Sequence, residues 1–191
     1  MPKQRITRAM VVDAAFALAR EGGMERVLVK DIAARLSCSV QPIYSCFRNM
    51  EELRRAVEGR TAQFLADYLS ARLAPDDLFR STGRAYVQLA RDEPELFKIF
   101  ILHRREGVSS LDGLYRAEAS PGVADTIAES LGLDQAAARR LHLDMLIYTV
   151  GLGTIFSVST PGIPAEELYA QQERAYQAFL NHAKEENNHE S

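Results

Sequence analysis

Apolar residues in this chain recur mostly every three or four positions, which is the spacing of one face of an α-helix. Val11, Ala14, Ala15 and Leu18 form the first such stripe, and Thr7 stands before it as an N-cap. Two glycines follow the stripe and predict the end of the helix, because glycine accepts the left-handed conformation of a C-terminal cap.

Similar start and stop signals continue to the end of the chain, while strand-like alternation is nearly absent. We therefore expect an all-α fold of about nine helices, in which the polar segment 104–119 is a loop. The second helix is expected over 29–36, the third begins after a cap at Ser39, and the fourth begins at a capping box of Asn49 and Glu52. Five later helices are expected near 76–91, 94–103, 120–131, 134–158 and 165–185.

The segment from Lys30 to Asn49 combines two short helices, a tight polar turn between them and the start of a long third helix. That layout is typical of a helix-turn-helix, which places one helix in the major groove of DNA. We expect Ile32, Leu36, Ile43 and Phe47 to pack these helices onto the first one, with the small Ala33 and Ala34 permitting close approach. The first quarter of the chain is thus predicted to bind DNA.

The remaining residues of this segment are expected to face outward and contact DNA. Gln41 can pair with adenine through two hydrogen bonds, and Val40 or Pro42 can touch a thymine methyl group. Ser39 belongs to the same surface, and phosphate contacts are expected from Lys30, Tyr44, Ser45 and Arg48. Lys3, Arg5 and Arg8 could form a basic arm that follows the DNA backbone or enters a minor groove, or simply a disordered terminus.

The charge distribution agrees with a DNA-binding N-terminus. Residues 1–60 carry 11 Lys and Arg against 7 Asp and Glu, a net +4, whereas residues 61–191 carry 12 against 19, a net −7. The start of the chain has no apolar region typical of a secretory signal, and no apolar run approaches the roughly 20 residues of a membrane span. We expect a cytoplasmic protein that contacts no membrane.

Residues 5–60 resemble the TetR family of bacterial transcription regulators. The matching features are the cap and stripe of the first helix, the run Asp31-Ile32-Ala33, the pair Ile43-Tyr44, Phe47, and the opening Asn49-Met-Glu-Glu-Leu53 of the fourth helix. The resemblance implies an all-helical homodimer with an N-terminal DNA-binding domain, here 1–50, and a C-terminal effector-binding and dimerisation domain, here 51–191. We place the boundary inside the fourth helix.

The chain departs from the family pattern at four positions. The family usually has glycine where Ser37 stands and a polar cap where Leu28 stands, and lysine is frequent at the positions of Val40 and Met50. Fewer lysines predict weaker nonspecific binding and a shallower dependence of DNA affinity on salt.

The C-terminal part is expected to hold an apolar pocket for a small effector. The aromatic and apolar residues that we expect to converge there, with two histidines as polar partners, are Phe64, Tyr68, Tyr86, Phe97, Phe100, Ile101, His103, His142, Met145 and Tyr148. A filled hydrophobic core is the alternative interpretation of each of them.

The helices near 134–158 and 165–185 carry more apolar stripes than one chain needs, so a four-helix bundle of two subunits is expected. The predicted interface residues are Leu141, Leu152, Ile155, Leu168, Ala175, Tyr176 and Phe179. Two reading helices would then bind a near-palindromic site about one turn of DNA apart.

Three classes of function follow from these features. The first is a sequence-specific regulator, in particular a ligand-responsive repressor; the second is an effector-free DNA-binding protein of chromosome organisation or division; the third is an all-helical enzyme with a structural head. No nucleophile elbow, phosphate loop or metal-ligand spacing supports catalysis, a metal or a cofactor. Cys38 is expected to be a small buried residue and Cys46 half-exposed, with a redox role as the alternative.

Overall fold

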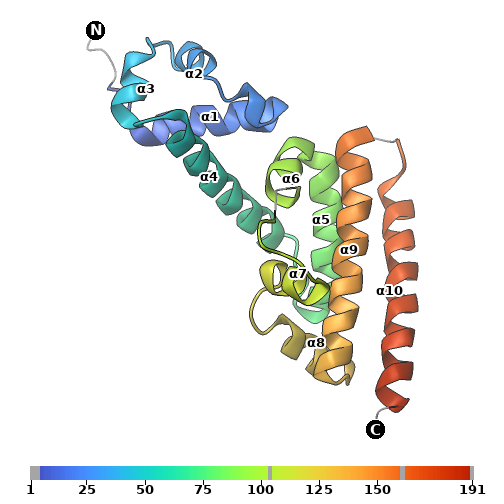
Figure 1. Cartoon of the computed structure of the whole chain (residues 1–191). Helices are drawn as coiled ribbons and strands as arrows, with labels where there is room; N and C mark the ends of the chain where they lie inside the picture. The colour runs from blue at the N-terminus through green and yellow to red at the C-terminus, as the bar shows by residue number, and fades with distance from the viewer. Residues whose placement is uncertain (1–4, 103–104, 160–161, 190–191) are drawn as a thin grey trace. The chain divides into compact units, whose positions relative to one another are not determined.

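A computed structural model describes residues 5–102, 105–159 and 162–189, without the side chains of residues 188 and 189. Every regular element in that part of the chain is helical, which confirms the expected all-α fold (Figure 1). Its ten α-helices are α1 (Arg8–Gly22), α2 (Val29–Arg35), α3 (Gln41–Cys46), α4 (Met50–Ser70), α5 (Leu78–Asp92), α6 (Pro94–Ile101), α7 (Leu111–Glu118), α8 (Val123–Leu131), α9 (Gln135–Ser159) and α10 (Ala165–His189).

The chain forms two compact units, and α5 begins in one and ends in the other. The head unit comprises residues 1–71 and 89–103, and the body unit comprises residues 72–88 and 104–191. This grouping by contacts differs from our division at residue 50, because α4 packs along its length with α1 and α6. The assignment of DNA binding to 1–50 and of effector binding and dimerisation to 51–191 stays a prediction.

The head unit is built around α1, which contacts α2, α3, α4 and α6. Its buried residues come from all five helices and include Val11, Ala15, Leu18, Ile32, Ile43, Phe47, Leu53, Val57 and Leu96. The Arg20 guanidinium of α1 donates two hydrogen bonds to the Glu93 carboxylate, and the one from Nε is 2.7 Å long. Because Glu93 is buried and immediately precedes α6, this charged pair fixes α6 to α1.

The body unit is centred on α9, which packs against α8 and α10. Its core includes Ile127, Leu133, Ala138, Leu141, Met145, Tyr176, Leu180 and Ala183. On one side the Phe79 ring lies 5.8 Å from the His142 ring and 5.6 Å from the Tyr176 ring, measured between centroids. The Tyr115 hydroxyl and Nδ1 of His142 share a hydrogen bond of 3.0 Å.

Several helix ends are where the sequence predicts them. Thr7 Oγ1 accepts a hydrogen bond from the Met10 N–H at the start of α1, and Gly23 ends that helix with a φ of 81°. Asn49 Oδ1 accepts from the Glu52 N–H at the start of α4, and Asp134 Oδ1 accepts from the Ala137 N–H at the start of α9. These caps satisfy backbone groups that a helix end otherwise leaves without partners.

Two local predictions are wrong. The segment expected to be a loop contains α7, whose N-cap Ser110 accepts a hydrogen bond of 3.0 Å from the Gly113 N–H and whose Tyr115 is buried. Burial of that ring and a good cap outweigh the low helix propensity of glycine inside the helix. Ser39 does not cap α3, because the helix begins one residue later than expected, with Val40 at the cap position and no side-chain hydrogen bond there.

By length and composition alone, the helix α9 is apolar enough to cross a membrane. Our expectation that no apolar run approaches that length therefore fails for α9 on composition. Part of the apolar surface of α9 is buried against α8 and α10, and the polar Thr149 and Ser157 are buried with it. This is the pattern of a helix packed on more than one side within a helical body.

Ser37 has a φ of 50°, and it is the only residue other than glycine with a positive φ in the described part of the chain. A side chain costs about 1–2 kcal/mol in this left-handed region, whereas glycine costs little there but loses more entropy on folding. Ser37→Gly should therefore raise the free energy of unfolding by about 0.5–1 kcal/mol, measured by thermal and urea unfolding. The control Ser39→Gly, at a position outside that region, should be neutral or destabilising. A lower melting temperature for Ser37→Gly would contradict the argument.

Burial between aromatic rings lowers the pKa of His142 from its ordinary value of 6.5. The unfolded chain then binds a proton at a higher pH than the folded one, so stability is full above pH 6.5 and falls as the pH drops below it. Urea unfolding midpoints should decrease with falling pH in this window, and His142→Gln should flatten that decrease. His182→Gln, at a histidine whose side chain is 67% exposed, is the matched control substitution. Identical slopes for native protein and His142→Gln would reject the assignment.

Candidate nucleic-acid interface

The side chains of α2, α3 and the turn between them divide into a buried and an exposed set. Ile32, Ile43 and Phe47 are 0%, 1% and 3% exposed, so one side of each short helix belongs to the core. Ala33 is also buried, Leu36 is half-buried, and Ala34 is exposed, so only the first alanine serves the close approach that we expected. The expected core of a helix-turn-helix is therefore present, apart from Ala34.

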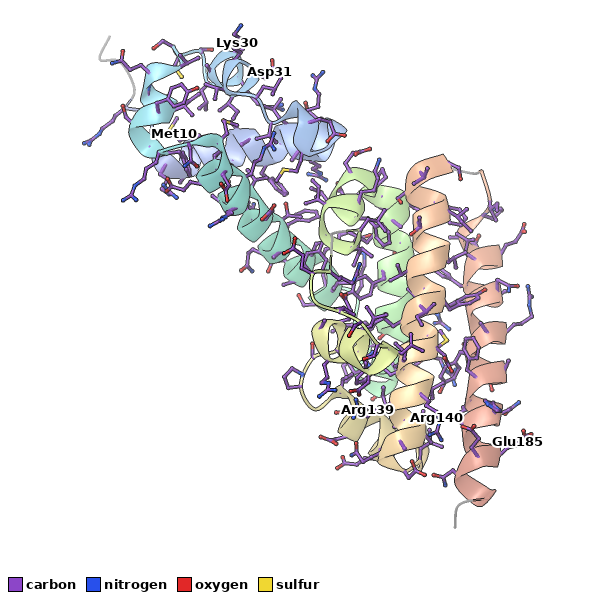
Figure 2. The ribbon with its side chains drawn as sticks, viewed as in Figure 1. Met10, Lys30, Asp31, Arg139, Arg140 and Glu185 are labelled. Atoms are coloured by element: carbon purple, nitrogen blue, oxygen red, sulfur yellow. The ribbon has the colours of Figure 1, made fainter. Side chains whose placement is uncertain are left out.

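The residues expected to contact DNA all lie at the surface of the head unit. Pro42 is half-buried, and the exposed ones are Lys30, Ser39, Val40, Gln41, Tyr44, Ser45 and Arg48. We call these eight residues the reading face. Lys30 is labelled in Figure 2, where it lies on the outside of α2.

The reading face exposes apolar surface that folding alone does not explain. Tyr44 is 57% exposed and Val40 is 40% exposed, although both lie next to well-filled core positions. These two exposed apolar side chains, four residues apart, are available for contact with a partner. Ser45 Oγ already donates a hydrogen bond of 3.1 Å to the Gln41 carbonyl, and must release it to donate to a phosphate.

The basic residues near the N-terminus do not form one group. Lys3 lies outside the described residues, and Arg5 is exposed. Arg8 Nη1 donates to the carbonyl of Cys46 at 2.7 Å and to Glu52 Oε1 at 2.9 Å, so it is engaged inside the head. The basic arm stays a prediction, with Arg8 already hydrogen-bonded to Cys46 and Glu52.

The corner between α3 and α4 is held by side chains from both sides. Glu52 Oε2 accepts a hydrogen bond of 2.9 Å from the Arg48 N–H, so the expected capping box closes on Arg48 instead of Asn49. This backbone hydrogen bond and the one from Arg8 lower the pKa of the Glu52 carboxyl. Cys46, at the end of α3, and Cys38, in the turn, are half-buried free thiols.

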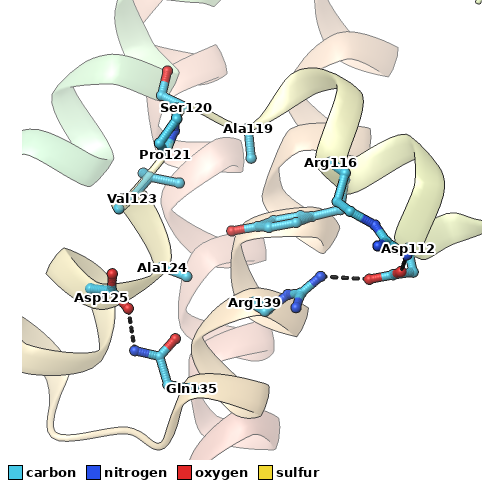
Figure 3. Close-up of a pocket in the computed structure, with 12 residues that line it drawn as sticks. Asp112, Arg116, Ala119, Ser120, Pro121, Val123, Ala124, Asp125, Gln135 and Arg139 are labelled. Carbon is cyan, nitrogen blue, oxygen red and sulfur yellow. Dashed lines mark hydrogen bonds and ion pairs between the residues drawn. The ribbon is translucent and has the colours of Figure 1, made fainter.

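A cavity of about 460 Å³ opens in the body unit between α7, α8 and the start of α9 (Figure 3). The Asp112 carboxylate forms ion pairs with Arg116, one turn later, and with Arg139 of α9, at 2.5 Å for Arg139. The Arg139 guanidinium lies 5.0 Å from the centre of the Tyr115 ring. Across the cavity, Gln135 Nε2 donates to the Asp125 carboxylate.

The apolar residues expected to form an effector pocket belong to both units. Phe64, Tyr68, Phe97, Phe100 and Ile101 are in the head unit, and Tyr86, Met145 and Tyr148 are in the body unit. His103 lies outside the described residues, and His142 lies in the body among Phe79 and Tyr115. None of the described ones is on the wall of the cavity in Figure 3.

The predicted interface residues also separate into two groups. Leu141, Leu168 and Tyr176 are 1%, 4% and 3% exposed within one chain, so these three are core residues with no surface left for a second copy. Leu152, Ala175 and Phe179 are half-buried, and Ile155 is 56% exposed. The sequence showed apolar stripes on both helices but could not show which stripe the rest of the chain covers.

Sequence reasoning missed the charged contacts of both sites. The spacing of Asp112 and Arg116, four apart, could have indicated their helical ion pair. No sequence signal connects Arg139 to Asp112, or Arg8 to Cys46, because those contacts join segments far apart in the chain. Among the described residues, no group of three or more His, Cys, Asp or Glu side chains could hold a metal ion.

Comparisons with known proteins show what this chain is similar to. The family model for bacterial regulatory proteins of the tetR family matches residues 11–57, which include all of the helix-turn-helix. A solved structure of a TetR variant from Acinetobacter baumannii AYE in complex with minocycline is similar over 95% of this chain and 98% of that chain, with a TM-score of 0.59 and 16% identity. No curated protein matches the chain by sequence.

The family match and the structural likeness cover different parts of the chain. The first identifies the head by its sequence, and the second shows that the full length of the chain has the same fold. The family match shows that this chain belongs to the TetR family of DNA-binding bacterial regulators, which are not enzymes.

Proposed function

We propose that this protein is a cytoplasmic, ligand-responsive repressor that binds a palindromic operator as a homodimer. The observation that supports it most is the reading face, whose polar and apolar side chains are exposed while Ile43 and Phe47 are buried behind them. Of the two other hypotheses, the all-helical enzyme is excluded by the family. An effector-free protein of chromosome organisation differs in binding many chromosomal sites instead of a few.

Sequence recognition is assigned to Gln41, with Val40 and Pro42 beside it. Gln41 is exposed in the first turn of α3, where residues of a recognition helix reach base edges. Lys30 and Arg48 are exposed charges that suit phosphate, which fixes register and supplies affinity independent of sequence.

Gln41→Ala should weaken binding to the operator by about 1–3 kcal/mol and relax the preference at one base position. The operator is first selected from random DNA by the native protein, and affinities are then measured by fluorescence anisotropy on single-base variants. Lys30→Ala is the matched comparison: it should weaken binding to all variants alike and reduce the salt slope by about one. Equal discrimination by native protein and Gln41→Ala would reject the base contact.

Self-association is assigned to one exposed stripe of α9. Ile147, Ile155 and Val158 are 46%, 56% and 68% exposed, and with Gly151 they lie at helical spacing on one face. A Cβ added at Gly151 would meet nothing within 4 Å in the chain, so a second helix can approach closely there. Two-fold symmetry through this stripe then calls for half-sites roughly 34–36 Å apart.

Ile155→Glu should convert the dimer to a monomer at micromolar concentration, because it places an unpaired charge in an apolar interface. Sedimentation velocity measures the change. Leu111→Glu is the matched control, since Leu111 is a 63% exposed leucine of the body unit outside this stripe. A native protein that is monomeric at that concentration, or a dimeric Ile155→Glu variant, would contradict the assignment.

Effector binding is assigned to the cavity in the body unit. Its wall offers two guanidinium and two carboxylate groups beside Pro121 and Val123, which suits a small polar molecule with charged groups of both signs. The effector would act by binding one conformer of the dimer more tightly than the conformer that fits the operator.

Ala119→Trp should fill this cavity and abolish release of the operator by an effector, while operator binding without effector stays unchanged. The effector is first found by screening small zwitterions for operator release, followed by anisotropy with the native protein. If Ala119→Trp still responds to that compound, the effector site lies elsewhere. The apolar residues expected from the sequence, Phe64 and Tyr148 among them, would then be the next to test.

A further inference from the structure

The reading helix α3 has only six residues, too few to be stable or to hold a direction by itself. Its position relative to α1 and α4 is therefore set by tertiary contacts. We propose that Arg8 is a positioning residue of the reading face: it fixes the C-terminal end of α3 and does not contact DNA. The inference rests on the proposed recognition of DNA by α3.

Three contacts of Arg8 converge on the corner where α3 ends. Nη1 donates to the backbone carbonyl of Cys46, the last residue of α3, at 2.7 Å, and to Glu52 Oε1 of α4 at 2.9 Å. The guanidinium also lies 3.9 Å from the centre of the Phe47 ring, the C-cap of α3. One side chain of α1 thus contacts the end of α3 and the first turn of α4 at once.

Glu52 extends this arrangement to the backbone of the corner. Its second carboxylate oxygen accepts from the Arg48 N–H at 2.9 Å, and its own N–H donates to Asn49 Oδ1 at 2.8 Å. The segment from Cys46 to Asn49 is therefore held by hydrogen bonds to the Cys46 carbonyl, the Arg48 N–H and the Asn49 side chain. Recognition geometry must be held within about 0.5 Å and 10–20°, so loosening this corner should cost base contacts.

The chemistry requires arginine in this place. A planar guanidinium can stack on a ring while it donates to two acceptors, whereas a lysine ammonium is a compact point charge. The Arg8 side chain is 52% exposed, but its charge is already matched by the Glu52 carboxylate within the head. Exposed ion pairs are individually weak, so the proposal depends on the shared network at the corner and not on the pair alone.

The head provides a matched control on the same two long helices. Arg60 of α4 lies 3.4 Å from the Asp13 carboxylate of α1, and its guanidinium lies 4.8 Å from the centre of the Phe16 ring. Arg60 therefore makes the same kinds of contact as Arg8, an ion pair and a cation–π contact, but these contacts join α4 to α1 and not to α3. Loss of Arg60 should lower stability without moving the reading face.

The experiment compares Arg8→Ala, Arg8→Lys, Glu52→Gln and Arg60→Ala in the full-length protein. Affinities for the selected operator and for random duplex are measured across a salt series, and folding is checked by circular dichroism and thermal unfolding. Arg8→Ala and Arg8→Lys should lose about tenfold in operator affinity with an unchanged salt slope, while binding to random duplex changes by less than about twofold. Arg60→Ala should change neither affinity by more than about twofold.

Glu52→Gln gives the sharpest contrast. Removing a negative charge beside DNA should strengthen binding if charge alone matters, but loosening the corner should weaken operator binding and leave random duplex nearly unaffected. If Arg8→Ala cannot fold, Arg8→Lys and Glu52→Gln still carry the test.

The proposal is overturned if Arg8→Lys binds the operator like native protein, or if Arg8→Ala lowers the salt slope by about one, as a phosphate contact does. It is also overturned if Glu52→Gln binds the operator more tightly. A failure of the proposed function is distinct from these results: the native protein would then select no sequence, or Gln41→Ala would bind every variant like native protein.

Discussion

The burial of Ile43 and Phe47 is the constraint on which the DNA-binding surface depends. Both side chains are almost fully buried, and they lie four residues apart on the inner side of a six-residue helix and its cap. A helix of this length has no stability of its own, so its shape and direction come from the core beneath it. The outer side is then free to carry the exposed side chains of the reading face.

The other contacts of the head hold its helices around this buried pair. The helix α1 is the platform, because it contacts α2, α3, α4 and α6. Buried apolar residues hold the five helices together, while Arg20 with Glu93 and Arg8 with Glu52 join segments that apolar packing alone would leave free to slide. Apolar contacts are non-directional, whereas charge-assisted hydrogen bonds fix an orientation.

The helix α9 has apolar residues on two different sides. One side of this helix supplies the core through Leu141 and Met145, and another exposes Ile147, Ile155 and Val158. An almost continuously apolar helix results, which explains why its composition also resembles that of a membrane-spanning segment. The proposed self-association through the exposed stripe would cover that apolar surface.

The sequence by itself determined the helical class, most helix ends and the helix-turn-helix, because caps, glycines and apolar spacing act over a few residues. It also separated the reading face from the core around Ile43, since a period of 3.6 residues assigns sides to a helix. Only the tertiary structure decided that Arg8 is engaged with Cys46 and Glu52, that Leu141 belongs to the core, and that Asp112 and Arg139 share a cavity wall. Those contacts join distant segments, and their partners depend on how helices pack, which local periodicity does not encode.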